Sequence, residues 1–351
     1  MTSNLSPQVR LLREDESIPL PESLACAAGF VGLDPWLSFV HRTYDFPVYR
    51  IVSEVRDDAD ADGWLALVRV KHLIFGDYLT TSPFGSYGGF ACSSLVSRDA
   101  LLERARMLGN ELGVEHVNVR FDADVEPPEG WIQHPVYATY LVELVSDPHR
   151  LMSGYSSDHR NHIRKSFKRG FSIQFGHLDL LDDAYEAMAR SMHELGSPYH
   201  AKAYLRRMAE SLGNALEFAV MYGRQGELAG AGVFILQGNT VTNLHANILR
   251  RFRSDYGGEF LYWLALERYC RKGFKTFDLG RSLIGSGNET FKMKWAPHKK
   301  RLAYWYTLMP GHQLPELNQK NPKFQLAISI WKRLPALIVR PLGPALIRGL
   351  A

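Results

Sequence analysis

Apolar and polar positions follow two patterns along the chain, one typical of helices and the other of strands. Apolar residues recur at helical spacing, or surround the helix almost completely, in residues 97–112, 181–195, 201–212 and 259–272. Apolar runs that read as strands lie at residues 9–12, 49–55, 64–73, 116–121, 137–145 and 302–308. Residues 216–249 hold three such runs separated by the turns RQGEL and GN, which predicts an antiparallel meander. The sequence therefore predicts an α/β (α+β) fold whose second half contains a mixed sheet.

The two halves of the chain repeat one arrangement of helix, terminal glycine and strand. Gly113 ends the helix in the first half, Gly273 ends its counterpart, and a strand follows each. Aligning the two glycines places Asn118 opposite Asp278. The tripeptide Tyr-Gly-Gly also precedes both helices. This pattern indicates a duplicated unit in which only the second copy carries the carboxylate.

The stretch at residues 274–295, FKTFDLGRSLIGSGNETFKMKW, concentrates chemistry around flexible backbone. Bulky and β-branched residues predict a strand that ends at Asp278, and a glycine-rich loop follows. Arg281, Ser282 and Lys292 lie in or beyond this loop. One interpretation is a hairpin loop with solvated charges. The other is a ligand site at the end of a core strand, where α/β proteins usually bind ligands.

Two further polar pairs lie near the predicted meander. His245 and Asn247 alternate with apolar neighbours on its last strand, so both side chains are expected on one face. Tyr199 and His200 belong to the loop GSPYH between two amphipathic helices. A lone strand histidine is more often hydrogen-bonded structure than a catalyst, and both interpretations stay open for His245.

A basic helix is predicted between Asp158, which is placed to cap it, and Gly170. Its apolar residues lie four apart on one face, so the cations project away from the core: Arg160, Arg164, Lys165, Lys168 and Arg169. The surface is either a solvated basic face or an anion-binding surface, and five cations with one acid favour the second. His159 and His162 are three residues apart on this helix. No further ligands accompany them in the sequence, so no metal site is predicted.

Composition narrows the class of protein. The 351 residues are 46% hydrophobic and 22% charged, as in globular proteins, and the length predicts roughly two domains. The net charge of +4 is mildly basic and fits an anionic partner. Three widely spaced cysteines indicate neither a disulfide framework nor a zinc site. The first residues lack the apolar core of a signal peptide, and no apolar run approaches the roughly 20 residues of a membrane-spanning helix. A cytoplasmic location is expected.

The tail at residues 321–351 mixes apolar residues with interspersed lysines and arginines. Pro335, Pro341 and Pro344 are expected to break it into short helical pieces. The tail is too charged and too broken to span a bilayer. Two interpretations stay open: peripheral contact with an anionic surface such as the inner membrane, or packing on the body of the protein.

The loop RRFRSDYGGEF at residues 250–260 is similar to the acetyl-coenzyme A loop of the GNAT acyltransferases, whose pattern is Q/R-x-x-G-x-G/A. Arg253 and Gly258 match this pattern, whereas Tyr256 stands at its first glycine and Gly257 lies between. Backbone amides at a helix start attract phosphate and pyrophosphate, and the arginines of the loop add positive charge.

An ordered set of motifs resembles the FemAB-related branch of the acyl N-acyltransferase superfamily, in particular the FemAB-like proteins associated with bacterial exosortase systems. The set is RNHIRKSFKRG, NLHAN, RSDYGG and FDLGRSLIGSGNETFKMKW, with WKRLP in the tail. The resemblance implies tandem GNAT-like domains with mixed, mostly antiparallel sheets flanked by helices. Residues 1–150 form the first domain, residues 151–312 the second domain with the active site, and residues 313–351 a basic amphipathic tail.

This resemblance implies an N-acyltransferase that moves an acyl or aminoacyl group to an amine of a cell-envelope, polysaccharide or peptide precursor. Fem-type relatives take their group from aminoacyl-tRNA, and their functionally important lysine lies in an F-K segment that corresponds to Phe291 and Lys292. Acyl-CoA or aminoacyl-tRNA is the expected co-substrate, with no tightly bound cofactor and no DNA partner. Two rivals are a non-catalytic RNA-binding module that uses the basic helix, and a peripheral membrane partner of an envelope export or assembly system that uses the tail.

The chemistry of amine acylation assigns roles to the candidate residues. The reaction passes through a tetrahedral oxyanion, for which Lys292 and Arg281 are the candidate cations. The attacking amine must be neutral, so Asp278 is the first candidate base and His245 the second. No covalent nucleophile is required, and direct transfer in a ternary complex is expected. The candidate substrate-binding residues are Arg160, Arg164, Lys165, Tyr199, His200, Asn247, Arg253, Tyr256, Gly257, Gly258 and Ser282.

Overall fold

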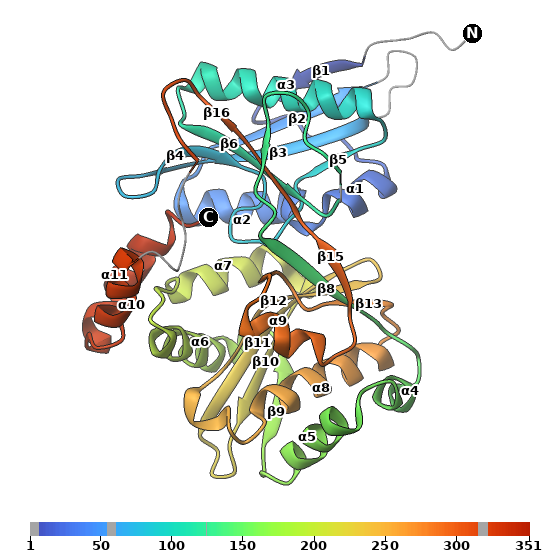
Figure 1. The fold of residues 1–351 in the computed structure, drawn as a ribbon, viewed down its shortest axis with the longest axis vertical. Coiled ribbons are helices and arrows are strands. Elements are labelled where there is room, and N and C mark those ends of the chain that lie inside the picture. The colour runs from blue at the N-terminus through green and yellow to red at the C-terminus, as the bar shows by residue number, and fades with distance from the viewer. Residues whose placement is uncertain (1–6, 55–60, 124, 315–321) are drawn as a thin grey trace. The chain divides into compact units, whose positions relative to one another are not determined.

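The computed structural model describes residues 7–54, 61–123, 125–314 and 322–351, and its chain forms two compact units (Figure 1). The first unit comprises Met1–Tyr137, Arg301–Glu316 and Arg348–Ala351. The second comprises Ala138–Lys300 and Leu317–Ile347. Part of the predicted tail, residues 315–321, lies outside the described residues.

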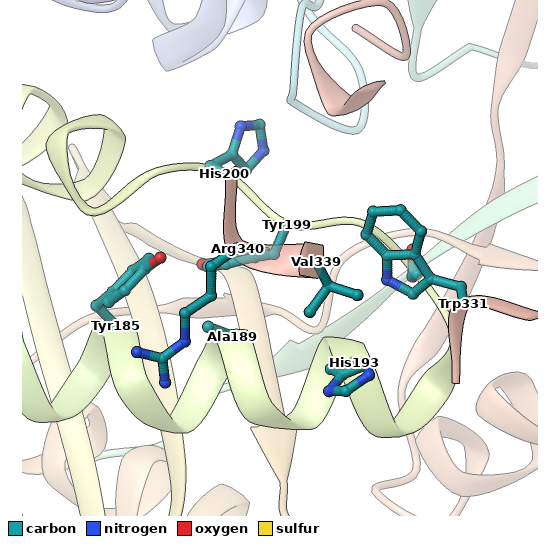
Figure 2. A pocket seen from close by; sticks show the side chains of 9 residues that line it. Tyr185, Ala189, His193, Tyr199, His200, Trp331, Val339 and Arg340 are labelled. Atoms are coloured by element: carbon teal, nitrogen blue, oxygen red, sulfur yellow. The ribbon is translucent and has the colours of Figure 1, made fainter. Parts of the chain in front are cut away.

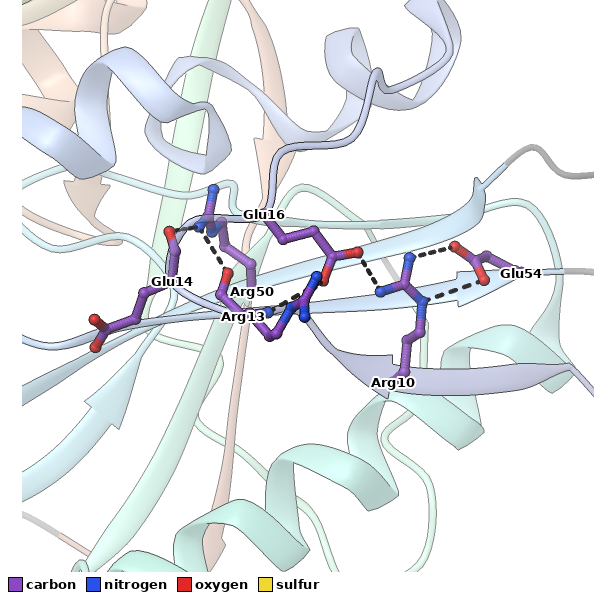
Figure 3. Close-up of polar contacts among 6 residues, drawn as sticks. All are labelled: Arg10, Arg13, Glu14, Glu16, Arg50 and Glu54. Atoms are coloured by element: carbon purple, nitrogen blue, oxygen red, sulfur yellow. Dashed lines mark hydrogen bonds and ion pairs between the residues drawn. The ribbon is translucent and has the colours of Figure 1, made fainter.

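The first unit is a mixed sheet with helices packed against it. Its strands lie in the order β1 (Gln8–Leu11), β2 (Val48–Glu54), β3 (Ala61–His72), β4 (Gly76–Thr80), β6 (His116–Phe121), β16 (Ala303–Leu308) and β7 (Ile132–Gln133), and β5 (Phe90–Cys92) pairs with β3. Its helical elements are α1 (Glu22–Ala28), η1 (Phe30–Gly32), α2 (Asp34–Tyr44) and α3 (Leu95–Leu112). Arg10 donates to Glu54 at 3.1 Å and to Glu16, and Arg50 donates to the Glu14 carbonyl oxygen at 2.7 Å (Figure 3). These bonds tie β1 and β2 together at the edge of the sheet.

The second unit repeats this architecture. Its strands lie in the order β9 (Ser172–Gly176), β10 (Leu216–Tyr222), β11 (Leu228–Gln237), β12 (Thr240–Ile248), β13 (Thr276–Asp278), β8 (Tyr137–Glu143) and β14 (Ser282–Leu283), and β15 (His298–Arg301) pairs with β8. Its helical elements are α4 (Pro148–Ser153), α5 (Ser157–Phe167), η2 (Leu178–Leu180), α6 (Leu181–Leu195), α7 (Lys202–Leu212), η3 (Gly213–Ala215), η4 (Arg250–Phe252), α8 (Gly257–Arg271), α9 (Gly287–Met293), α10 (Pro322–Trp331) and α11 (Ala336–Ile347). The predicted meander is confirmed as β10, β11 and β12.

Each sheet contains a parallel strand pair at the corresponding place. In the first unit β4 and β6 pair with Thr80 opposite Asn118, and in the second β12 and β13 pair with Thr242 opposite Asp278. An antiparallel strand follows on the far side of the pair, β16 in one sheet and β8 in the other. The alignment of Asn118 with Asp278 expected from the sequence is therefore confirmed.

Each half of the chain contributes the flanking strand of the other half's sheet. β8 follows the first half in sequence but lies in the second sheet, whereas β16 follows the second half but hydrogen-bonds to β6 in the first sheet. The sequence ranges assign residues 303–308 to the second domain, and the structure places them in the first unit. An apolar strand pattern carries no record of its pairing partner, which is why the sequence did not reveal the exchange.

Helices cover both faces of the second sheet (Figure 1). On one face α8 supplies Tyr269, which packs against Phe234 and Phe277 in a single apolar cluster. The intervening strand positions Val233 and Ile235 are buried outside that cluster, on the face covered by α6 and α7. Because Phe277 lies on the α8 face, alternation directs its neighbour Asp278 to the opposite face of the sheet.

Two local predictions are wrong. Ser156, not Asp158, caps α5 by accepting from the His159 amide at 3.2 Å, because the helix begins two residues earlier than a cap at Asp158 would place it. Pro341 and Pro344 do not break the tail, since both lie inside the continuous helix α11. Each proline removes one backbone donor, and the helix is exposed along much of its length, so water can satisfy the released carbonyl groups. Within the described residues no helix is both long enough and apolar enough to cross a membrane.

Candidate active site

Asp278 ends β13 and organises the loop that follows it. Its buried carboxylate accepts from the Thr139 hydroxyl on β8 at 2.5 Å and from the Gly280 amide at 2.8 Å. Gly280 has a left-handed φ of 75°, which turns its amide back toward the carboxylate. Both hydrogen bonds favour the ionised carboxylate and hold the start of the loop in place.

Lys292 reaches the same loop from α9. Its buried ammonium donates to the carbonyl oxygens of Gly280 at 2.7 Å and of Arg281 at 2.8 Å. Burial lowers the pKa of Lys292 to about 8, while the Asp278 carboxylate acts in the opposite direction. The structure thus brings Asp278, Arg281 and Lys292 together around one loop, although the ammonium binds backbone rather than open space. Ser282, next in this loop, is buried, and its hydroxyl has no hydrogen-bond partner among the described residues.

A β-bulge places His245 on the face covered by α6 and α7. Phe234 of β11 is opposite Asn243 and Val233 is opposite His245, so Leu244 is an extra residue in β12. Before the bulge, Asn243 donates to the Tyr262 hydroxyl of α8 at 2.8 Å. After it, His245 and Asn247 share the opposite face, as the sequence predicted for this pair. Asn247 donates to the sulfur of a methionine on α6 at 3.5 Å.

A small hollow of about 20 Å³ lies between α6, the loop after it and the two tail helices (Figure 2). Its wall includes Tyr185, His193, Tyr199, His200, Trp331 and Arg340. The ring of His245 lies 6.0 Å from that of Tyr199 and 6.5 Å from that of His200. Burial lowers the pKa of His245 to about 4 and also lowers the pKa of His200. Both imidazoles are therefore neutral at pH 7, and His245 Nε2 has no hydrogen-bond partner among the described residues.

The start of α8 is open where its counterpart in the first unit is capped. Tyr256 precedes α8 with a left-handed φ of 61° and makes no side-chain cap, whereas the Ser94 hydroxyl accepts from the Ser97 amide at the start of α3. Tyr256 thus adopts the conformation that glycine takes without strain. A Cβ at Gly257 would lie 2.9 Å from the Phe252 carbonyl oxygen, so only glycine fits there without a shift. The first amides of α8 are consequently available to an anion.

Arg253 and the basic helix α5 flank this helix start in different ways. Arg253 donates to the Ile248 carbonyl oxygen at 2.9 Å and therefore fixes the loop before α8. Lys165 lies over the Tyr256 ring with its Nζ 5.8 Å from the centroid, and Arg164 is exposed. Arg160 instead donates to the carbonyl oxygens of Ser153 and Tyr155. Of the predicted cations of the basic segment, Lys165 lies over Tyr256, and Arg169 pairs with Asp255 at 3.3 Å just before α8.

Several residues of these clusters were not predicted from the sequence. Glu289 on α9 accepts from the Tyr140 hydroxyl at 2.9 Å and from Lys299 at 2.5 Å. Lys299 and then the Gly285 amide lower the pKa of Glu289 to about 2. Ser286 caps α9 in an S-x-x-E pattern, a signal that would have placed Glu289 at a helix start. No comparable signal marks the tail residues of the hollow, because only tertiary packing brings α11 to α6.

The sequence and the fold were compared with those of known proteins. The acetyltransferase (GNAT) domain family matches residues 155–293. FemX has a similar structure, with a TM-score of 0.62, 12% identity, and coverage of 80% of this chain and 92% of FemX. A tandem GNAT protein from the clavulanic acid biosynthesis pathway has a TM-score of 0.51, 13% identity, and coverage of 86% and 98% of the two chains.

The N-myristoyltransferase of Saccharomyces cerevisiae with bound myristoyl-CoA is also similar, with a TM-score of 0.51, 10% identity, and coverage of 88% and 87%. No curated protein matches the sequence. Residues 155–293 thus match the acetyltransferase (GNAT) domain family, and the chain has a fold of two GNAT-like units similar to those of FemX and the tandem GNAT protein.

Proposed function

We propose that this protein is an N-acyltransferase that uses an acyl-CoA donor and has its active site in the second unit. The observation that carries the proposal is the open start of α8, which lies inside the matched GNAT stretch. A helix start with free amides attracts phosphate, and Lys165 adds positive charge beside it. The corresponding helix of the first unit is capped by Ser94, which favours donor binding in the second unit alone.

The course of β12 supports a path for the acyl group. Its parallel ladder with β13 ends at Thr242 and Asp278, while β12 continues to Ile248 and leads through η4 into α8. A donor with its phosphates at α8 can lay its extended arm along the last residues of β12, where backbone groups can bind its amides. The thioester then lies near the end of β13.

The hollow between α6 and the tail supplies an acceptor site. Aromatic side chains such as Trp331 offer flat apolar surface, and the guanidinium of Arg340, which Glu186 binds at 2.7 Å, has further donors for a phosphate or carboxylate group. The acceptor amine approaches from this side past Tyr199 and His200. The acceptor class is an amine on a cell-envelope, polysaccharide or peptide precursor, and the resemblance to the exosortase-associated FemAB-like proteins supports the envelope.

The chemical step is direct attack of the neutral amine on the thioester carbonyl, without a covalent enzyme intermediate. The carbon–nitrogen bond forms, the thiol of coenzyme A leaves, and the amine proton passes to a base. The carboxylate of Asp278 already accepts two hydrogen bonds, so its geometry favours a positioning role. His245, neutral with a ring nitrogen available, is the better-placed proton acceptor. Lys292 holds the carbonyl groups of the loop, and Arg281 supplies the cation for the oxyanion.

The proposal that the donor is an acyl-CoA is tested by measuring acetyl-CoA binding. Acetyl-CoA should bind the wild-type protein, and combined Arg164→Glu and Lys165→Glu substitutions should weaken binding at least about tenfold, which corresponds to a loss of about 1.4 kcal/mol. Arg206→Glu on α7 is the matched control, because it reverses an exposed charge away from α8. Absence of acetyl-CoA binding, together with retention of aminoacyl-tRNA, would replace the donor assignment.

The proposal that His245 accepts the amine proton during acyl transfer is tested with His245→Ala. Mass spectrometry of peptide, polysaccharide and lipid-precursor mixtures incubated with acyl-CoA should detect an acylated amine with the wild-type protein. The His245→Ala variant should bind acyl-CoA normally but transfer it at least 100-fold more slowly, within the usual range for loss of an acid–base group of about 10²–10⁴. Undiminished transfer would assign His245 to structure.

Exposed apolar side chains on the tail favour a second, compatible function at a membrane surface. Leu337, Leu342 and Ile330 are exposed, whereas Val339 and Gly343 of α11 are buried against the second unit. Exposed cations, Lys332 and Arg333, lie between the two tail helices. One face of the tail thus packs on the body and the other offers apolar and basic groups to an anionic bilayer.

A further inference from the structure

Three potential metal ligands meet where α5 packs on the start of α8. His159 and His162 come from α5 and Glu259 from the first turn of α8. One ligand atom from each residue lies within 4.8 Å of the others. The sequence predicted no metal site, because the third ligand is separated from the two histidines by nearly 100 residues, and only the fold brings it close.

The state of His159 is the independent observation. Its side chain is 2% exposed, yet neither ring nitrogen has a hydrogen-bond partner among the described residues. Aromatic rings surround it, with Trp295 at 4.4 Å and Tyr155 at 5.4 Å between centroids. A buried polar group without a partner costs about 1–3 kcal/mol, so a ligand that bonds to this imidazole offsets a real penalty.

We propose that His159, His162 and Glu259 form a binding site for a divalent transition-metal ion, with Zn²⁺ as the best fit. Two imidazoles and one carboxylate are a common ligand set for zinc, with bonds of about 2.0–2.2 Å. Tetrahedral bonds of that length place ligand atoms roughly 3.5 Å apart. Side-chain rotations that close the present separations by about an ångström therefore complete the site. The fourth position remains for water or an exchangeable anion.

A metal ion that binds here must displace the groups that now contact Glu259 and His162. Lys294 Nζ lies 3.6 Å from a Glu259 carboxylate oxygen, and its 39% exposed side chain can swing into water. His162 Nε2 lies 3.5 Å from Asp158, whereas His162 Nδ1 has no hydrogen-bond partner among the described residues. A metal ion thus competes with one exposed lysine for Glu259, and removal of that lysine should strengthen metal binding.

The test is a titration of tag-free protein with Co²⁺, followed through its visible absorption, and displacement of Co²⁺ by Zn²⁺. One ion should bind per chain. Glu259→Gln and His162→Ala should each weaken Zn²⁺ binding at least about tenfold. Lys294→Met should tighten it, a result that simple disruption of the fold does not produce. His149→Ala, which removes an exposed histidine on α4, should leave the affinity unchanged.

Urea unfolding of each variant establishes that the second unit remains folded. Failure of the wild-type protein to bind either ion with 1:1 stoichiometry would overturn the proposal. So would equal affinities in the wild type, Glu259→Gln and His162→Ala. Because these measurements require no acyl donor, they separate the metal site from the proposed transferase activity.

Discussion

Burial of the charged Lys292 lowers the free energy of unfolding of the second unit, and this effect depends on pH. An ammonium that is 7% exposed has lost most of its hydration, and two carbonyl oxygens replace only part of it. Its pKa of about 8 lies below the ordinary value of 10.5. The folded state therefore releases the proton more readily than the unfolded state does. Below pH 8 the amine is charged in both states, and the cost of burying the charge is fully present.

The first prediction follows from this linkage. Between pH 8 and 10.5 the unfolded state binds more protons, so the free energy of unfolding of the wild type should rise with pH relative to that of Lys292→Met. The full effect is about 3 kcal/mol, from roughly 1.4 kcal/mol for each pKa unit. Urea unfolding of both proteins at pH 7 and pH 10 measures it. A difference between the two proteins that stays constant across this range contradicts the assignment of a buried, charged lysine.

Lys275→Met is the matched reference for this experiment. Lys275 is exposed and lies just before β13, so water hydrates its amine in both the folded and unfolded states. Comparison of the two variants separates the effect of burying a lysine from the effect of removing one. Activity also distinguishes Lys292 from Lys275. The Lys292→Met variant should lose acyl-transfer activity even at pH 7, because the Gly280–Arg281 loop is displaced.

At the scale of elements, the start of α8 depends on two adjacent glycines that differ in their surroundings. An added Cβ at Gly257 would meet the Phe252 carbonyl oxygen at 2.9 Å and the Ile248 side chain at 2.9 Å. At Gly258 it would meet only the edge of the Phe291 ring, at 3.1 Å. The carbonyl group of Phe252 belongs to the backbone and moves less easily than the side-chain ring of Phe291. The two positions therefore form a matched pair for the same substitution.

The second prediction is that Gly257→Ala destabilises the protein more than Gly258→Ala. Overpacking against backbone should lower the free energy of unfolding by about 1–3 kcal/mol at residue 257. At residue 258 the better helix propensity of alanine, worth up to about 1 kcal/mol, offsets most of the milder contact. Urea unfolding and acetyl-CoA binding of both variants provide the measurements. Equal losses for the two substitutions would show that the close approach at Gly257 does not limit this turn.

Elements were predictable from the sequence where local pattern determines them. The apolar faces of residues 181–195 and 201–212 gave α6 and α7, and the turns of the meander gave β10 to β12. The bulge at Leu244 was not predictable, because one extra residue leaves the apolar pattern of the strand almost unchanged. Yet this residue decides which face receives His245. Similarly, nothing in residues 303–308 encodes that β16 pairs with β6.

Across the whole molecule, duplication supplies two similar units and sequence differences give them different chemistry. Asn118 and Asp278 occupy corresponding positions, but Asn118 donates to the Trp305 carbonyl oxygen at 3.2 Å, whereas Asp278 holds the loop beside Lys292. The Tyr-Gly-Gly repeat and the terminal glycines made this relation visible in the sequence. The ligand clusters were less visible, since Thr139, Glu259 and Arg340 reach them from segments distant in the chain. Contacts of that kind follow from tertiary packing and leave no local periodic signal.

The tail provides the prediction that belongs to the whole molecule. Leu337 is 88% exposed and Leu342 is 48% exposed on α11, beside the cations Lys332 and Arg333. If this face enters an anionic bilayer, each inserted leucine contributes roughly 1.5–3 kcal/mol of binding free energy. The wild-type protein should therefore float with vesicles of phosphatidylglycerol and phosphatidylcholine. Leu337→Glu combined with Leu342→Glu should abolish flotation, and raising the salt concentration should weaken it for the wild type.

Leu73 offers a control that separates a specific membrane face from general exposure of leucine. It is fully exposed, at 105%, in the turn between β3 and β4 of the first unit. Leu73→Glu changes charge and hydrophobicity as each tail substitution does, but leaves the tail intact. This variant should float as the wild type does. If Leu73→Glu abolishes flotation as completely as the tail substitutions, or if the wild type does not float, then the exposed face of α11 is not a membrane-binding surface, and the tail serves to close the hollow around Trp331 and Arg340.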